Sequence, residues 1–289
     1  MDSVIRTAKD ALQAKASAFL SAKYSLCQDD EGIDLRNNYL KLLEVICAAE
    51  EMGTNLGRQS PLVNAGYAIR TSTMIKQLLS FTKYHRSDDG ICAPLNIVVL
   101  GAGFDVMGLA ALLSLENIHV IEIDLPPIVA AKKAILSNPK IRKILATNQK
   151  ETVTTDDQEH LWRLTYASGS SYTLISGDLQ ELPTLKETLS ALPVLNNQSS
   201  TLVLSELVLA YIPPEHSDAL LQWLCSNFLH NSPGSALVLY EPIGKTSVDV
   251  HGCLAVSVTQ GYKYPQTYFD RFPAKLERRR SPQKSTTYD

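Results

Sequence analysis

The sequence has 289 residues, of which 45% are hydrophobic and 20% are charged, and its formal net charge is −3. A chain of this length can bury a full core in one large α/β domain or in two small ones. The slightly negative charge provides no overall basic field of the kind that binds nucleic acids, so an acidic substrate would have to be met by local charges.

The cysteines and the apolar segments exclude further classes. The five cysteines are scattered, odd in number and without Cys-x-x-Cys spacing, so we expect reduced thiols and predict no metal site. No stretch approaches the about 18 uninterrupted apolar residues of a membrane span, and no apolar segment of signal-peptide length opens the chain. These features predict a soluble, cytoplasmic protein with no membrane partner.

Residues 1–90 have helical periodicity and contain no convincing strand. Residues 3–20 are rich in alanine and lysine, with apolar positions spaced near 3.6 residues, and residues 39–49 and 71–82 repeat this pattern. We therefore predict an N-terminal helical cap in front of a sheet.

The segment 57–70 is predicted to be a loop that enters the last of these helices and ends at Arg70. Arg70 has two interpretations. It is either a solvated surface charge or a planar fork that clamps a carboxylate through two hydrogen bonds.

The stretch 96–126 has the order strand, tight turn, helix, strand. A short β-branched run meets Gly101-Ala102-Gly103, helical spacing follows, and a second short apolar run ends in Asp124. This order is typical of the first half of a nucleotide-binding βαβ unit, in which the glycines let the backbone approach the ligand and the acid accepts two ribose hydroxyls. The alternative is a packing turn, which any α/β protein can contain.

The residues after the glycines favour one kind of nucleotide over another. A diphosphate would need a third glycine early in the helix, but Phe104-Asp105 follow the turn and Gly108 comes two positions late. An aspartate at a helix start would repel a diphosphate, whereas it could accept hydrogen bonds from a cationic or neutral ligand. The pattern therefore favours S-adenosylmethionine over NAD.

From residue 96 onward, predicted strands alternate with predicted helices, which indicates a largely parallel sheet with helices on both faces. The segment 139–170 is polar and is predicted to be irregular. A helix is expected to begin near Pro213, with His216 facing solvent. The other predicted elements are a helix at 127–136 and strands at 171–176, 201–205 and 235–240.

Acidic residues follow four successive predicted strands: Asp124, Asp178, Glu206 and Glu241. Ligands bind at the carboxyl ends of the strands in open α/β sheets. We expect the first three acids to form a cluster that could hold ribose hydroxyls, an adenine amino group and an ammonium group.

The pattern weakens after Glu241, and the sequence near the end, with Arg278-Arg279-Arg280, is typical of a disordered segment. We predict three parts, which are the cap at 1–90, a cofactor-binding core at 91–272 and a disordered tail at 273–289.

Five ordered segments together resemble the leucine carboxyl methyltransferase family, over about residues 15–272. They are residues 60–70, 100–105, 122–126, 177–179 and 205–211. The resemblance implies a Rossmann-like class I methyltransferase that uses S-adenosylmethionine. It further implies that Arg70 holds the methionine carboxylate and that Asp124 holds the ribose. With Gly103 of the glycine turn, the predicted cofactor-binding residues are Lys15, Arg70, Gly101, Gly103, Asp124, Asp178, Leu179 and Glu206.

The chain departs from the family at one motif near the predicted pocket. Family members usually have Asn-Arg-Gly-Tyr where this sequence has Asn64-Ala65-Gly66-Tyr67, so one positive charge is absent.

The function that we expect is a carboxyl O-methyltransferase. A carboxylate with a reference pKa of about 4 is already a nucleophile at neutral pH, so no strong general base is needed. The resemblance suggests the C-terminal leucine of type 2A protein phosphatase catalytic subunits as the substrate. Tyr211 is the predicted catalytic residue, with a role in positioning the acceptor; its alternative role is core packing. We expect a monomer.

Two alternatives remain open. One is the branch of the family that completes wybutosine in phenylalanine tRNA, but that branch normally carries a β-propeller that 289 residues cannot hold. We also expect no nucleic-acid partner, because the sequence gives no indication of a basic groove. The other alternative is a non-catalytic binding protein that keeps the fold.

Overall fold

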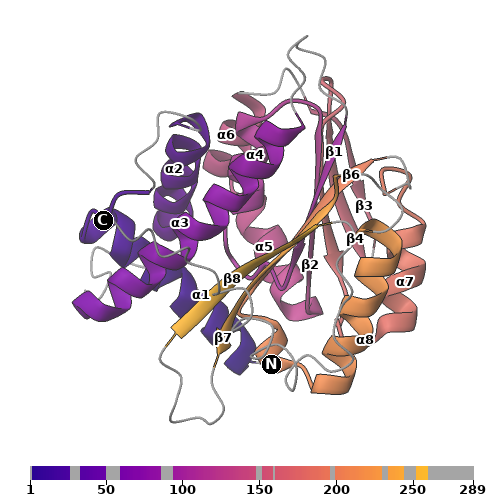
Figure 1. Ribbon diagram of the computed structural model, residues 1–289. Helices are drawn as coiled ribbons and strands as arrows, with labels where there is room; N and C mark the ends of the chain where they lie inside the picture. The colour runs from indigo at the N-terminus through magenta and orange to yellow at the C-terminus, as the bar shows by residue number, and fades with distance from the viewer. Residues whose placement is uncertain are drawn as a thin grey trace, which may run out of the picture.

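An eight-stranded sheet forms the centre of the computed structural model, in the order β3-β4-β5-β2-β1-β6-β7-β8 (Figure 1). The residues that the structure describes are 2–26, 33–49, 59–85, 94–147, 152–158, 160–195, 199–229, 234–243 and 252–259. The tail predicted at 273–289 lies outside them.

The five inner strands β5, β2, β1, β6 and β7 are parallel, whereas β3 and β4 at one edge and β8 at the other are antiparallel to their neighbours. The predicted α/β class with a largely parallel sheet is therefore confirmed. The strands are β1 Leu95–Leu100, β2 Ile118–Asp124, β3 Thr152–Asp157, β4 Leu161–Tyr166, β5 Ser171–Ser176, β6 Ser200–Glu206, β7 Ala236–Ile243 and β8 Gly252–Thr259.

The prediction that 139–170 is irregular was wrong. This segment contains a helix and the two strands of the β3–β4 edge. In β4, Trp162, Leu164 and Tyr166 are buried while the residues between them are half-buried. This alternation of period two is typical of a strand with one covered face. The strand was not predicted because polar residues interrupt its apolar run.

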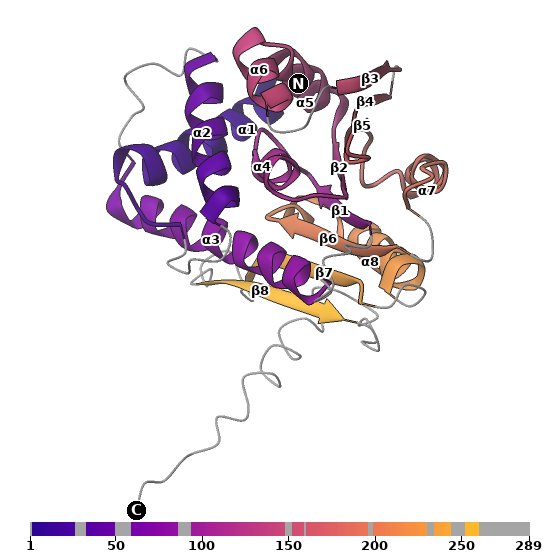
Figure 2. The ribbon, with the colours of Figure 1, turned by 90° about the horizontal axis from the view of Figure 1, so that it is seen from above.

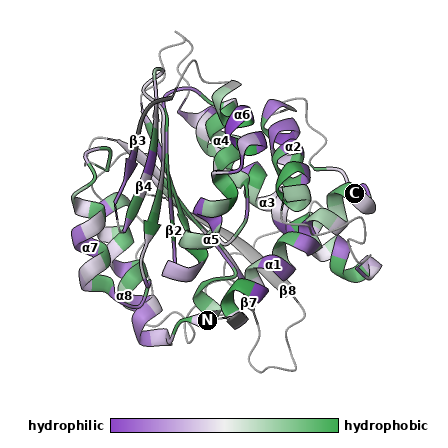
Figure 3. Ribbon diagram, turned by 180° about the vertical axis from the view of Figure 1, so that it is seen from behind, coloured by the Kyte–Doolittle hydropathy of each residue, from purple (hydrophilic) through white to green (hydrophobic). Residues whose placement is uncertain are grey.

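Helices cover both faces of the sheet (Figure 2). On one face lie α1 Asp2–Ala16, α2 Ile33–Ala49, α3 Pro61–Tyr84, α4 Met107–Ser114, α5 Pro126–Leu136 and α6 Pro139–Thr147. On the other face lie α7 Leu182–Ser190 and α8 Pro214–Leu224, whose hydrophobic residues stand out in Figure 3. Short π-helical turns follow α1 at Ser17–Ser21 and α8 at Cys225–Leu229, and a 3-10 turn spans Leu209–Tyr211.

Helix α3 begins earlier than the sequence predicted, because Ser60 caps it. The Ser60 Oγ accepts a hydrogen bond from the Val63 N–H at 3.3 Å, and Pro61 occupies the first helical position. Arg70 therefore lies within a helix and not at the end of a loop. Within the described ranges, no helix is long and apolar enough to cross a membrane.

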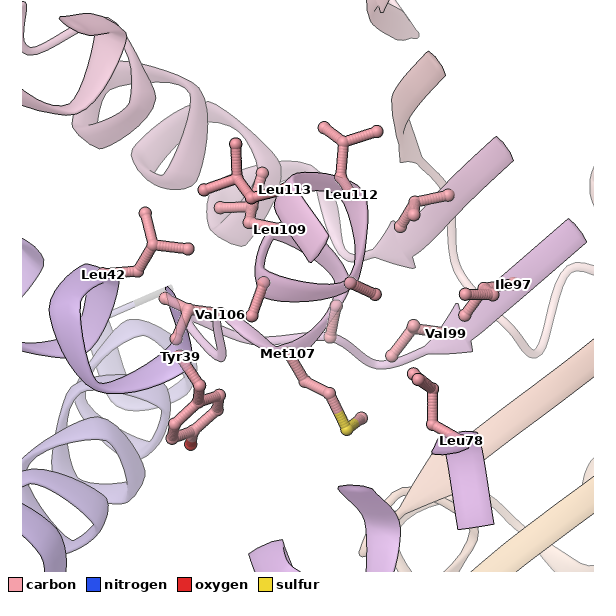
Figure 4. Close-up of a cluster of buried hydrophobic side chains, with 14 of the residues drawn as sticks. Tyr39, Leu42, Leu78, Ile97, Val99, Val106, Met107, Leu109, Leu112 and Leu113 are labelled. Atoms are coloured by element: carbon pink, nitrogen blue, oxygen red, sulfur yellow. The ribbon is translucent and has the colours of Figure 1, made fainter. Parts of the chain in front are cut away.

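Two hydrophobic clusters form the core, one on each face of the sheet. Successive residues of β1 alternate between them, because Ile97 and Val99 belong to one cluster and Val98 belongs to the other. Figure 4 shows Ile97 and Val99 together with Leu78 of α3 and Met107 of α4. The N-terminal helices thus share one core with the sheet, and the division into a cap at 1–90 and a core at 91–272 stays a prediction.

Candidate functional site

A cavity of about 580 Å³ opens at the carboxyl ends of β1, β2, β5 and β6, between the sheet and helices α1 and α3. Each residue that the sequence predicted for the site lines this cavity. These residues are Lys15, Arg70, Gly101, Gly103, Asp124, Asp178, Leu179, Glu206 and Tyr211.

The turn after β1 depends on two glycines. Gly101 and Gly103 have φ angles of +57° and +52°, in the left-handed region that other residues rarely adopt. A Cβ atom at Gly101 would also lie 2.6 Å from the Cγ2 of Val208, so the turn packs directly on the loop that follows β6. The glycine at 101 is therefore required both by the backbone angle and by its neighbour.

The Asp124 side chain folds onto this turn. Its Oδ2 accepts a hydrogen bond from the Gly103 N–H at 2.6 Å, and its Oδ1 accepts one from the Leu125 N–H at 2.7 Å. Burial raises the pKa of Asp124, and these two hydrogen bonds offset part of that rise. Each carboxylate oxygen has a second lone pair, which a hydroxyl group in the cavity could use.

Two cations and two acids form a cluster on the cavity wall. The Lys15 Nζ lies 2.5 Å from the Asp105 Oδ2 and 3.1 Å from the Glu206 Oε1. The Arg70 Nε is ion-paired with the same oxygen of Glu206. Burial alone would lower the pKa of Lys15, but Asp105 and Glu206 outweigh this effect, so the pKa is raised and the ammonium stays charged.

Arg70 is partly buried, so it is not a solvated surface charge. Its guanidinium lies over the ring of Tyr67, 5.0 Å from the ring centroid, in a cation–π contact. Glu206 binds the Nε, and the described residues give the two terminal nitrogens of Arg70 no partner. Those two nitrogens form an edge that can donate two parallel hydrogen bonds to a carboxylate.

The structure corrects the expectation that Asp105 is available to a cationic ligand. Its Oδ1 accepts hydrogen bonds from the N–H groups of Val106 and Met107, at 2.6 and 3.2 Å, while its Oδ2 binds Lys15. Burial alone would raise the pKa of Asp105, but Lys15 and Lys132 outweigh it and lower the pKa. The cation beside Asp105 is thus supplied by the chain itself.

Sequence reasoning missed a buried ionic network around Glu122, which lines the cavity. The Lys132 Nζ lies 2.5 Å from the Glu122 Oε2, and the Tyr172 hydroxyl donates to the same oxygen at 2.6 Å. Lys132 also donates to the Asp105 carbonyl oxygen at 2.7 Å, which ties the network to the turn. Burial raises the pKa of Glu122, and Lys132 offsets part of the rise. The available signal was a glutamate between two isoleucines in a strand, at a position whose neighbours are buried.

Two further acids behave differently. The Asp178 Oδ1 accepts a hydrogen bond from the Gln180 N–H at 2.9 Å, and Asp178 and Leu179 both line the cavity. Glu241 does not line the cavity, and it lies within β7, which extends to Ile243, and not after the strand as the sequence predicted. The predicted cluster of Asp124, Asp178 and Glu206 is therefore brought together without the fourth acid.

Tyr211 lies at the cavity with 76% of its side chain exposed. The alternative that it packs in the core is wrong. An exposed phenol beside the cavity has the freedom to contact a second ligand, although a role in catalysis stays a prediction. Ala65, where the family resemblance implies an arginine, does not line the cavity.

Comparison with known proteins gives a match to the family described as leucine carboxyl methyltransferase, over residues 9–225. Leucine carboxyl methyltransferase 1 of Debaryomyces hansenii is 27% identical over 253 residues, which are 84% of this chain and 66% of that protein. The rat protein of the same name is 31% identical over 180 residues, 59% of this chain and 48% of the relative. Human tRNA wybutosine-synthesizing protein 4 is 28% identical over 228 residues, 77% of this chain and 31% of the relative. The chain thus spans about half to two thirds of these leucine carboxyl methyltransferases.

Proposed function

The chain belongs to the leucine carboxyl methyltransferase family, and we propose that it binds S-adenosylmethionine in the cavity and catalyses transfer of a methyl group to an acceptor carboxylate. The observation that carries this proposal is the contact of Asp124 with the Gly103 N–H. It sets a carboxylate against the glycine turn on the β2 side of β1, while Glu206, paired with Arg70, ends β6 on the other side of β1.

The donor set of the cavity fits this cofactor. Asp124 would accept the ribose hydroxyls, Arg70 would bind the methionine carboxylate through its terminal nitrogens, and Glu206 would accept the ammonium group. Asp178 would accept the adenine amino group, with Leu179 against the base. When bound, S-adenosylmethionine supplies a methyl group carried by a positively charged sulfur. The acidic lining of the cavity suits that charge.

The residues of the chain have little proton chemistry to perform. A carboxylate acceptor with a reference pKa of about 4 arrives ionised at neutral pH, so its oxygen can accept the methyl group without losing a proton. The enzyme would instead supply alignment of the two reactants and exclusion of water. Tyr211, exposed beside the cavity, is our proposed residue for positioning the acceptor.

For the acceptor we propose the C-terminal leucine of type 2A protein phosphatase catalytic subunits. The support is the family match and the similarity to proteins named leucine carboxyl methyltransferase 1. A second candidate is a tRNA nucleoside of the wybutosine pathway, which is supported by the similarity to human tRNA wybutosine-synthesizing protein 4.

Titration calorimetry followed by a transfer assay tests this proposal. S-adenosylmethionine should bind with one-to-one stoichiometry, and labelled methyl groups should then appear on a leucine-terminated phosphatase-tail peptide. Label on wybutosine-precursor tRNA would favour the second candidate. Binding without transfer to either acceptor would indicate a non-catalytic binding protein, and absence of binding would overturn the proposal.

A further inference from the structure

Glu241 lies in β7 next to the loop that leaves β6, and its side chain is 1% exposed. Its Oε1 accepts hydrogen bonds from the N–H groups of Val208 and Leu209, both at 3.1 Å, and from the Ser205 Oγ at 3.3 Å. Its Oε2 accepts one from the Ala210 N–H at 3.3 Å. These described donors are all uncharged, so a buried carboxylate is bound here by backbone amides and one hydroxyl.

The amides of Val208, Leu209 and Ala210 are consecutive and converge on one carboxylate. Such successive N–H groups form a concavity that binds anions, and here the anion comes from the chain itself. The backbone just before them is unusual, because Leu207 has a φ of +53°, in the left-handed region that leucine rarely adopts. The Leu207 N–H donates to the Tyr240 carbonyl oxygen at 2.8 Å, which fixes the start of the loop on β7.

The loop held in this way carries one wall of the cavity. Glu206, Leu207, Val208 and Tyr211 all line it, and the Val208 side chain occupies the space that a Cβ at Gly101 would need. A movement of the 208–210 backbone would therefore disturb the glycine turn on one side and Tyr211 on the other.

We propose that Glu241 is a positioning residue, which holds the 208–210 loop and through it places Val208 and Tyr211 at the cavity. Residue 241 lies outside the residues matched by the family comparison, which end at 225. The effect on catalysis rests on the proposed function, whereas the anchoring of the loop does not depend on it.

The carboxylate is specifically required for this role. Burial raises the pKa of Glu241, and the backbone hydrogen bonds from the loop offset part of that rise. A glutamine of the same shape keeps one acceptor oxygen but presents an NH₂ group to either the Ala210 N–H or the Val208 and Leu209 N–H groups. Two donors cannot bond to each other, so at least one loop amide loses its partner.

The first test is amide hydrogen exchange in Glu241→Gln without any ligand. The matched control is Leu145→Ala, a buried residue of α6 in the hydrophobic cluster on the other face of the sheet, which lowers stability without lining the cavity. We expect the amides of 208–210 to exchange about tenfold or more faster in Glu241→Gln, the change that loss of a charge-assisted hydrogen bond predicts. In Leu145→Ala they should exchange faster only in proportion to the change in global stability. Exchange of 208–210 at the wild-type rate in Glu241→Gln would overturn the proposal.

The second test separates positioning from general destabilisation. Glu206 stays paired with β7 through the register Glu206↔Tyr240, whereas Tyr211 lies beyond the anchored amides. Glu241→Gln should therefore lower kcat for methyl transfer by about tenfold or more, and it should weaken S-adenosylmethionine binding by a smaller factor, because Val208 packs on the glycine turn. Faster exchange with an unchanged kcat would overturn the positioning role. If the wild type transfers no methyl group, the proposed function fails, and the exchange experiment still decides whether Glu241 anchors the loop.

Discussion

The Lys15 Nζ on α1 lies 3.1 Å from the Glu206 Oε1 at the end of β6, although 191 residues separate them in the sequence. Arg70 of α3 is ion-paired with the same carboxylate oxygen. Glu206 thus ties two N-terminal helices to the sheet at the cavity. A ligand with its own carboxylate and ammonium groups would meet a cation and an acid that already lie in place.

Asp124→Ala should weaken binding of S-adenosylmethionine. The substitution removes the carboxylate that would accept the ribose hydroxyls, and hydrogen bonds to a charged group contribute about 1.5–3 kcal/mol. Titration calorimetry measures the change. Asp157→Ala is the control, because Asp157 is an exposed strand residue paired with Lys133. Equal affinity of Asp124→Ala and the wild type would remove Asp124 from the binding site.

Arg70→Lys should not restore the affinity that Arg70→Ala loses. A lysine ammonium keeps the charge, but it cannot form two parallel hydrogen bonds to a carboxylate. Arg163→Lys serves as the comparison, since Arg163 donates to the Thr173 hydroxyl and does not line the cavity. If Arg70→Lys binds the cofactor as the wild type does, the proposed carboxylate clamp is incorrect.

Lys132→Met should destabilise the fold strongly, because it leaves Glu122 buried without its cation, which typically costs about 3–5 kcal/mol. Lys133→Met is a matched control on the same helix, since the surface pair of Lys133 with Asp157 contributes at most about 1 kcal/mol. Denaturant unfolding measures both. A similar loss in the two variants would contradict the role given to the buried pair.

The loss of folding stability in Lys132→Met should depend on pH. The pKa of Glu122 is already raised in the folded wild type, and removal of Lys132 raises it further. A carboxyl group with a raised folded-state pKa holds its proton longer in the folded state, so stability falls as pH increases from the unfolded pKa toward the folded one. The variant should therefore lose less stability at about pH 5 than at about pH 7.5. A loss independent of pH would show that Glu122 is not the group left unpaired.

Gly101→Ala should cost more stability than Gly103→Ala. Both residues need left-handed backbone, which costs an alanine about 1–2 kcal/mol. A Cβ at 101 additionally meets Val208 at 2.6 Å, whereas a Cβ at 103 meets only Ala8 at 3.9 Å. Overpacking adds about 1–3 kcal/mol at position 101, and Val208→Ala should recover part of it. Thermal unfolding of the single and double variants checks this order, and a larger loss in Gly103→Ala would contradict it.

The sequence could predict those parts of the site whose residues lie close to one another along the chain. Gly101, Gly103 and Asp124 lie on one βαβ unit, so their spacing already indicates that they meet. The parallel core strands were also predictable, because each is a short apolar run between turn signals.

Other contacts could not be predicted, because they join distant segments. Lys15 pairs with Asp105 across 90 residues, and nothing in the helical pattern around Lys15 indicates that it turns inward. Strand β4 was missed because two of its half-buried residues, Arg163 and Thr165, are polar. Strand β8 was missed because the sequence pattern weakens after Glu241. The role of Glu241 depends on three backbone amides, which no side-chain pattern records.

The proposed methyl transfer to an ionised carboxylate needs no enzyme base. Its most direct test is single-turnover methylation of a leucine-terminated peptide, beside the same peptide as its C-terminal amide, from about pH 6 to about pH 8. A general base would contribute about 10²- to 10⁴-fold to the rate and would appear as an inflection near its pKa. We predict a rate for the free carboxylate that is flat across this range and no transfer to the amide. Transfer to the amide, or a steep inflection near about pH 6.5, would contradict the carboxylate mechanism and indicate a hydroxyl or nitrogen acceptor activated by a histidine.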